Sequence, residues 1–281
     1  MLSALLASAG PPLSPAQLWS AWNLDPVLLA GLGGTAALYT RGRHLGARAA
    51  FDRWRAWCFA GALVAIGGAL VSPLDALSGA LASAHMVQHV ILVLVAAPLL
   101  ALARPVATLR RSVPRPLRRA GARWHRRLGL GRRRRPAWRD PVVVWLAHVA
   151  VLWAWHAAVL YQAAVDHQLL HIGEHASFLV TGVLFWSVVA GARRISDGYA
   201  ALLVFTMALQ SVFLSALLTF ARSPWYPVYA DTAGAWGLDP LADQQLAGAI
   251  MWVPAGFVYL GAALALMVAW VRASELGDAT A

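Results

Sequence analysis

Residues 78–102 read SGALASAHMVQHVILVLVAAPLLAL and are the strongest single indication of the fold class. The segment contains no Asp, Glu, Lys or Arg, and it is almost entirely aliphatic after His89. An uncharged stretch of this kind is typical of a helix that crosses a bilayer, because about 20 apolar residues span the hydrocarbon core. His85 and His89 lie four residues apart, so a helix would place both on one face.

Composition extends this interpretation to the whole chain. Of its 281 residues, 60% are hydrophobic and 12% are charged, and the mean hydropathy is +0.61. These values are typical of a multi-pass membrane protein rather than a soluble domain. The net charge of +11 would suggest a nucleic-acid partner if it were spread over a soluble surface, but the arginines are confined to expected loops. We therefore expect a lipid bilayer and no nucleic acid as the partner.

We predict an all-α membrane protein, a seven-helix transmembrane bundle that forms a single polytopic membrane domain over residues 1–281. Residues 103–140 are expected to form an Arg-rich cytoplasmic loop, which maintains the topology or binds anionic lipid or a cytoplasmic partner. The expected helices cover residues 24–40, 56–72, 78–102, 141–161, 168–190, 199–220 and 245–271.

The distribution of arginine predicts the orientation. Every arginine except Arg222 lies in the segments 41–55, 103–140 and 191–198 or in the C-terminal tail. With seven helices, these segments all lie on one side. Because cytoplasmic loops are enriched in positive charge, the N-terminus is predicted to lie outside and the C-terminus in the cytoplasm.

Two residue counts exclude several chemistries. The chain has no lysine, which excludes a retinal Schiff base, a lysine nucleophile and a Walker P-loop. Its single cysteine, Cys58, excludes an internal disulfide, a CxxC metal site and an iron–sulfur cluster.

A second histidine-rich stretch, residues 167–175, reads HQLLHIGEH and places three histidines at four-residue intervals. In the predicted topology, these histidines share the outer third of the bilayer with those of 78–102 and with His156. Ionisable groups in a membrane usually face an interior cavity, and imidazole is the commonest metal ligand among side chains. We therefore predict a metal site formed by His85, His89, His171 and His175, with His156 and His167 as weaker candidates.

Other polar groups are assigned less directly. Glu174 is expected to orient a metal-binding imidazole through a hydrogen bond, or else to cap the helix or form a local ion pair. Asp231 and Asp239 are expected at the mouth of the site, with Asp243 capping the helix that starts at 245. The thioethers of Met86, Met207 and Met251 are potential Cu(I) ligands, although core packing is the simpler interpretation.

Four motifs together resemble the CtaG-type cytochrome c oxidase assembly factors of bacteria. They are Trp22-Asn-Leu-Asp25-Pro26, His85-Met-Val-Gln-His89 with a later Pro98-Leu-Leu, His171-Ile-Gly-Glu-His175, and Asp243-Gln-Gln-Leu-Ala-Gly-Ala-Ile-Met-Trp-Val-Pro254. The resemblance runs from about residue 19 to 271, and the last motif is the most specific.

The resemblance implies a multi-pass protein of the bacterial plasma (inner) membrane that is not an enzyme. It implies a copper ion as cargo, and cytochrome c oxidase subunits and a copper donor as partners. Two alternatives remain open from the residues alone: a haem-binding membrane electron carrier, and a metal-free transporter or scaffold. Histidine pairs on one helix suit a small ion better than a haem held between facing helices.

Overall fold

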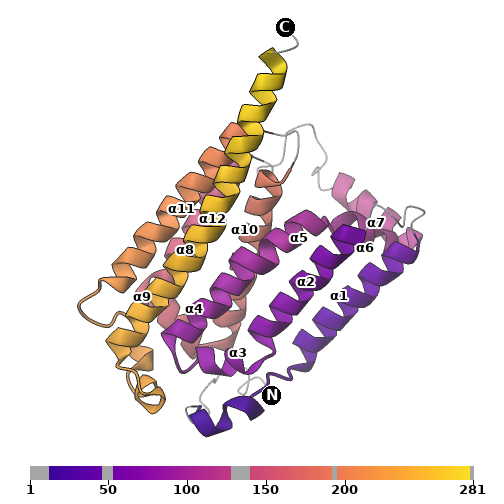
Figure 1. The fold of residues 1–281 in the computed structure, drawn as a ribbon. Coiled ribbons are helices and arrows are strands. Elements are labelled where there is room, and N and C mark those ends of the chain that lie inside the picture. Colours follow the sequence, from indigo (N-terminus) through magenta and orange to yellow (C-terminus); the bar gives the residue numbers. More distant parts are fainter. Residues whose placement is uncertain (1–12, 46–52, 128–139, 192–194, 279–281) are drawn as a thin grey trace.

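The computed structural model describes residues 13–45, 53–127, 140–191 and 195–278, and these residues form helices and connecting loops without any strand (Figure 1). Three parts of the expected arginine-rich loops, at 46–52, 128–139 and 192–194, lie outside the described residues. The all-helical class predicted from the sequence is confirmed for the described part of the chain.

Helices occupy all seven expected ranges. Five of these ranges contain α1 (Pro26–His44), α2 (Arg53–Leu70), α10 (Gln168–Val189), α11 (Asp197–Thr219) and α12 (Pro240–Asp278). The third range contains α4 (Ala82–Val90), η2 (Ile91–Ala96) and α5 (Ala97–Ala103). The fourth contains α8 (Pro141–His156) and α9 (Ala158–Asp166). The short helix η1 (Pro15–Ser20) precedes α1. Other short helices lie in the connections: α3 (Pro73–Ser78), α6 (Val106–Ser112), α7 (Arg115–Arg127), η4 (Pro227–Tyr229) and η5 (Ala233–Trp236).

Four helical segments are long and apolar enough to cross a membrane: Ala82–Ala103, α10, α11 and α12. The pair α8 and α9 makes a fifth if it is counted as one bent span. Arginines near the ends of α1 and α2 lower the mean hydropathy of these two helices. A count of seven spans and the orientation of the termini therefore stay predictions.

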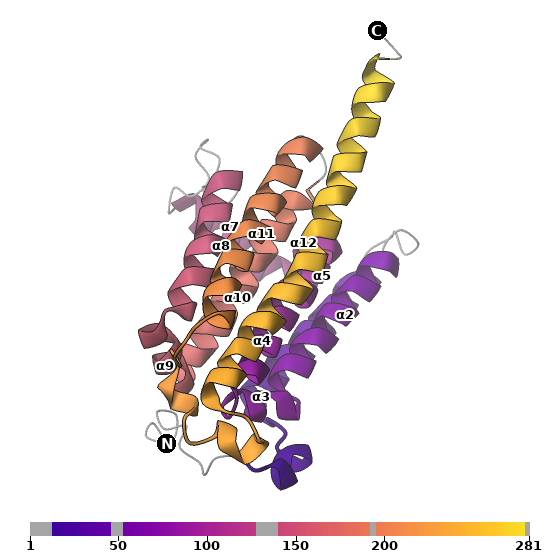
Figure 2. The ribbon, with the colours of Figure 1, turned by 60° about the vertical axis from the view of Figure 1, so that its left-hand side comes forward.

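The long helices run side by side, and α12 extends beyond its neighbours toward the C-terminus (Figures 1 and 2). Helix α12 packs mainly against α11 and α4, and α10 packs against α5 and α8. Gly248 permits the close approach of α12 to α11. A Cβ at this position would lie 2.7 Å from the Thr219 backbone nitrogen and 2.9 Å from the Ser215 carbonyl oxygen.

Two expected boundaries are wrong. The helix predicted over 141–161 is broken at Ala157, and α8 and α9 meet there at a bend of 73°. Ala157 has an extended backbone (ψ 129°), which interrupts the helical hydrogen bonds, and the hydroxyl of Tyr226 donates to the His156 carbonyl at 3.0 Å. The segment 103–140, predicted as a loop, contains α6 and α7 in its described part.

The helix over Ala82–Ala103 contains a wider turn in its middle. In η2 the amide of Ala97 donates to the Leu92 carbonyl, five residues back. Pro98 follows, and a proline lacks an amide proton and would clash with the carbonyl four residues earlier, so a wider turn relieves the clash. The indole of Trp186 in α10 donates to the Val93 carbonyl at 3.1 Å, which ties this turn to the neighbouring helix.

Asp243 does not cap its own helix. Helix α12 begins at Pro240, earlier than predicted, and Asp239 accepts from the Leu241 amide at 2.9 Å. The buried Asp243 carboxylate instead accepts from the amides of Ala82 (2.6 Å) and Ser83 (3.1 Å) and from the Ser83 hydroxyl (2.5 Å). It therefore caps the N-terminus of α4 across the fold, where Leu81 supplies no side-chain cap.

We predict that Asp243→Ala destabilises the protein by about 3 kcal/mol, because buried donors at the start of α4 lose a charged acceptor. Thermal unfolding in detergent would measure the loss. Asp140→Ala is the matched control, since the exposed Asp140 caps only its own helix, α8, and its loss should cost about 1 kcal/mol. Equal losses in the two variants would contradict a cross-fold role for Asp243.

Asp75 forms a second hydrogen-bonded connection between segments at the same end of the bundle. Its carboxylate accepts from the side chains of Asn23 (2.7 Å) and Gln88 (3.0 Å), and the Asn23 amide donates to the Val71 carbonyl (2.9 Å). This network joins the segment before α1 to α3 and α4. Burial raises the pKa of the Asp75 carboxyl, although both side-chain hydrogen bonds act to lower it.

A raised pKa means that the folded state binds the Asp75 proton more tightly than the unfolded state does. The contribution of Asp75 to stability should therefore fall as the pH rises from about 4 through the raised pKa. We expect the melting temperature of the wild type, relative to that of Asp75→Asn, to decrease over this range in detergent. A constant difference between the two proteins across the range would contradict the assignment.

Candidate metal centre

Four of the expected site residues meet between α4 and α10. His85 from α4 and His171, Glu174 and His175 from α10 each offer a ligand atom, and these atoms all lie within 4.8 Å of one another. The arrangement follows from the helical repeat, because residues three and four apart on α10 share the face that packs toward α4. We call these four residues the outer centre.

Glu174 lies among the imidazoles rather than behind them. Its Oε2 atom is 3.3 Å from His85 Nε2, and its Oε1 atom is 3.4 Å from His89 Nε2. The side chain is fully buried, and neither carboxylate oxygen has a partner in hydrogen-bond geometry. Among the described residues, no arginine pairs with this carboxylate. A buried charge without such a partner is unfavourable unless a cation or a proton neutralises it.

The loop before α12 covers the outer centre. The hydroxyl of Tyr229 donates to the Ser78 carbonyl at 3.0 Å, lies 3.4 Å from His85 Nδ1, and is 3.1 Å from the Tyr161 hydroxyl. His85 therefore directs Nδ1 toward Tyr229 and Nε2 toward Glu174. The sequence alone offered no signal for Tyr229, because it lies in a loop between predicted helices.

His89 lies beside the outer centre and connects it to His156. The centroid of its ring is 4.4 Å from that of His85, 5.3 Å from that of His175 and 5.9 Å from that of His156. His156 Nδ1 donates to the Leu152 carbonyl at 2.7 Å. His156 is therefore separated from the outer centre by His89. His167 is exposed at the start of α10, and the structure does not bring it to the cluster.

The donor set fits a metal ion. Both oxygens of Glu174 and one or both ring nitrogens of several buried histidines have no hydrogen-bond partner. Buried polar atoms are rarely left unpaired, because each costs about 1–3 kcal/mol. One ion among the Nε2 atoms of His85, His171 and His175 would pair several of these atoms together. Imidazole and carboxylate donors suit Cu, Zn, Fe or Ni, so the ligands do not select one metal.

A cavity of about 690 Å³ borders the outer centre. His171 and His175 line it from α10. Asn23 and Asp25, just before α1, and Asp75 in α3 line it from the other side. The acidic residues predicted at the mouth of the site do not line this cavity. Asp239 and Asp243 cap α12 and α4, and Asp231 is exposed in the loop. In the sequence, Asn23 stands out only as part of the motif Trp22-Asn-Leu-Asp25-Pro26.

Comparisons with known proteins bear on the whole chain. A family model described as cytochrome c oxidase caa3 assembly factor matches residues 2–273. Two similar curated proteins are the uncharacterized protein Mb0105 of Mycobacterium bovis and the uncharacterized protein MT0111 of Mycobacterium tuberculosis. Each is 28% identical over 276 residues, which cover 93% of this chain and 41% of the relative. The chain thus spans less than half the length of these relatives. No solved structure matches it.

Proposed function

Because the chain belongs to the cytochrome c oxidase caa3 assembly factor family, we propose that it holds a copper ion at the outer centre for delivery to the oxidase. The single observation that supports copper holding is the buried set of three imidazoles and one carboxylate within 4.8 Å of one another. The Glu174 carboxylate would balance the charge of a monovalent ion, so the loaded site would be neutral inside the bundle.

Release is as important as binding for a protein that passes on its cargo. His171 is half-buried and lines the large cavity together with His175, whereas His85 and Glu174 are fully buried. A partner's ligands could therefore replace His171 first, and the ion would leave stepwise through the cavity. The partners in this proposal are a copper donor and subunits of cytochrome c oxidase, in the bacterial plasma membrane.

The packing of the rings favours a small ion over haem. The His171 and His175 rings are 4.2 Å apart between centroids, and those of His85 and His171 are 5.2 Å apart. Rings in such direct contact leave no room for a porphyrin between them as axial ligands on opposite faces. The imidazoles can instead converge on one atom.

We predict that purified wild-type protein retains copper under reducing conditions and that the variant His85→Ala/His171→Ala/His175→Ala loses the ion of the outer centre, so that it binds at least one copper ion fewer per chain than the wild type. Elemental analysis and competition with a Cu(I) chelator would measure this. His167→Ala is the matched control, since it removes a nearby histidine that lies outside the cluster. If the control and the triple variant lose copper equally, or if neither does, the outer centre is not the copper site.

The same variants test the role in assembly. In a bacterium that lacks its own copy of the gene, the wild type and His167→Ala should restore oxidase activity, and the triple variant should not. Added copper should partly rescue the triple variant, because the proposed defect is in metal supply rather than in oxidase synthesis. Full activity with the triple variant at limiting copper would contradict the proposal.

A further inference from the structure

We propose that the protein contains a second, deeper site for monovalent copper, in a cavity lined by Met86, Met207, Met251, His148 and His156 and joined to the outer centre by His89. The cavity has a volume of about 40 Å³. This inference deepens the proposed function and rests on it for the identity of the cargo. We call this cavity the inner site.

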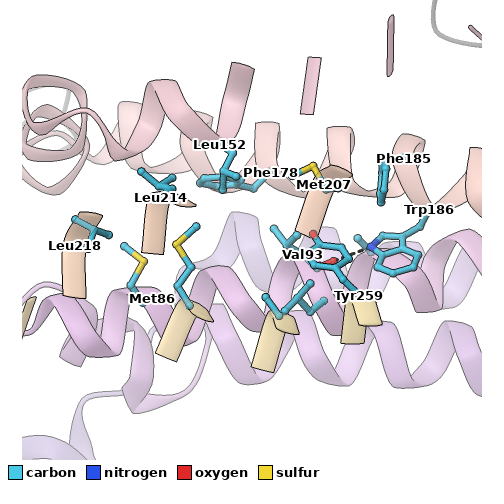
Figure 3. Close-up of a cluster of buried hydrophobic side chains, with 14 of the residues drawn as sticks. Met86, Val93, Leu152, Phe178, Phe185, Trp186, Met207, Leu214, Leu218 and Tyr259 are labelled. Atoms are coloured by element: carbon cyan, nitrogen blue, oxygen red, sulfur yellow. Dashed lines mark hydrogen bonds between the residues drawn. The ribbon is translucent and has the colours of Figure 1, made fainter. Parts of the chain in front are cut away.

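Three methionines, each from a different helix, line the inner site. Met86 belongs to α4, Met207 to α11 and Met251 to α12, and all three side chains are buried and line the inner site. Figure 3 shows Met86 and Met207 among the side chains that fill the space between the helices. Thioether sulfur is a soft donor that selects Cu(I) over harder divalent ions. Methionine also packs well in ordinary cores, so the methionines alone would not indicate a site.

The histidines supply the independent observation. His156 Nδ1 lies 2.7 Å from the Leu152 carbonyl, which can only accept, so Nδ1 carries the proton. His148 Nδ1 lies 2.9 Å from the Thr181 hydroxyl, which itself donates to the Ser177 carbonyl at 2.7 Å. His148 Nδ1 must therefore donate as well. In a neutral imidazole the other nitrogen then carries a lone pair.

These lone pairs have no protein partner. The Nε2 atoms of His148 and His156 are buried without a hydrogen bond, and both residues are at most 2% exposed. The hydrogen bonds to Leu152 and Thr181 hold both rings in place. In metal sites, a hydrogen bond from the ring nitrogen that does not bind the metal orients the imidazole in the same way. The inner site thus combines oriented nitrogen donors with thioether sulfur.

No acidic residue among those described lines the inner site, and this limits the charge of the ion that it could hold. The cost of placing an ion in a medium of low dielectric constant is high and rises steeply with its charge. Neutral, soft donors in apolar surroundings therefore favour a monovalent soft ion. The outer centre differs, because Glu174 can balance charge there. The two sites would hold copper at different depths in the bundle.

His89 connects the sites. It lines the inner site, its ring contacts those of His85 and His175, and neither of its ring nitrogens has a hydrogen-bond partner. An ion moving between the two sites could remain bound to this imidazole while it exchanges its other ligands. His89 is thus positioned to pass copper between the outer centre, which contains a carboxylate and borders the large cavity, and the enclosed inner site, whose donors are neutral.

The test uses full-length protein in detergent under anaerobic, reducing conditions, with Cu(I) alone as the probe. The variant Met86→Leu/Met207→Leu/Met251→Leu keeps side-chain volume nearly constant, so folding should persist. We expect two Cu(I) ions per wild-type chain and one per methionine variant. X-ray absorption of the loaded wild type should show copper–sulfur scattering that the variant lacks, and this spectrum tests the inner site without any substitution.

A second variant, His171→Ala/Glu174→Gln, separates this inference from the proposed function. It should lose the outer ion and keep the sulfur-bound one. The inner site would be overturned, and the outer centre would stand, if the wild type bound one ion without copper–sulfur scattering and the methionine variant bound the same amount. Sulfur-bound copper together with unchanged binding in His171→Ala/Glu174→Gln would overturn the outer centre and support the inner site. Wild type that binds no copper would overturn both.

Discussion

The burial of the Glu174 carboxylate among imidazoles is the constraint on which the centre of this bundle depends. Neither oxygen has a hydrogen-bond partner, although His85 Nε2 and His89 Nε2 lie 3.3 and 3.4 Å away. A charged group in an apolar interior must be neutralised, and neutral imidazoles cannot do this without a cation or a proton. The meeting of His85 and His89 from α4 with Glu174 from α10 therefore supports the cation site proposed above.

Polar contacts at both ends of the α4 segment hold it in the position that this site needs. Asp243 caps its first amides from α12, and Asp75 binds Gln88, which is the neighbour of His89. Further along, the Trp186 indole in α10 binds the carbonyl freed by the wide turn at Val93. These contacts come from three other parts of the chain. They constrain the position of α4, and with it the direction in which His85 and His89 face.

The donors change in character along the bundle. At the outer centre a buried carboxylate lies among the imidazoles, and the half-buried His171 borders a large cavity, which suits exchange with a partner. Beyond His89 the donors are neutral and include sulfur, and the space around them is small. In the proposed arrangement, one ion would pass from a site that contains a carboxylate to an enclosed site with neutral donors.

The sequence by itself determined the helical class, the approximate position of each long helix and the four-residue spacing of the histidines, because these features depend on local hydropathy and helical periodicity. The tertiary structure alone decided which histidines meet. His167 has the same spacing as His171 and His175, yet it lies before the first turn of α10 and stays exposed. The contact of Tyr226 with the bend at Ala157, the capping of α4 by Asp243 and the lining of one cavity by three methionines also involve residues far apart in the chain. Periodicity specifies the faces of one helix, whereas the orientation of two helices toward each other depends on contacts that no local pattern records.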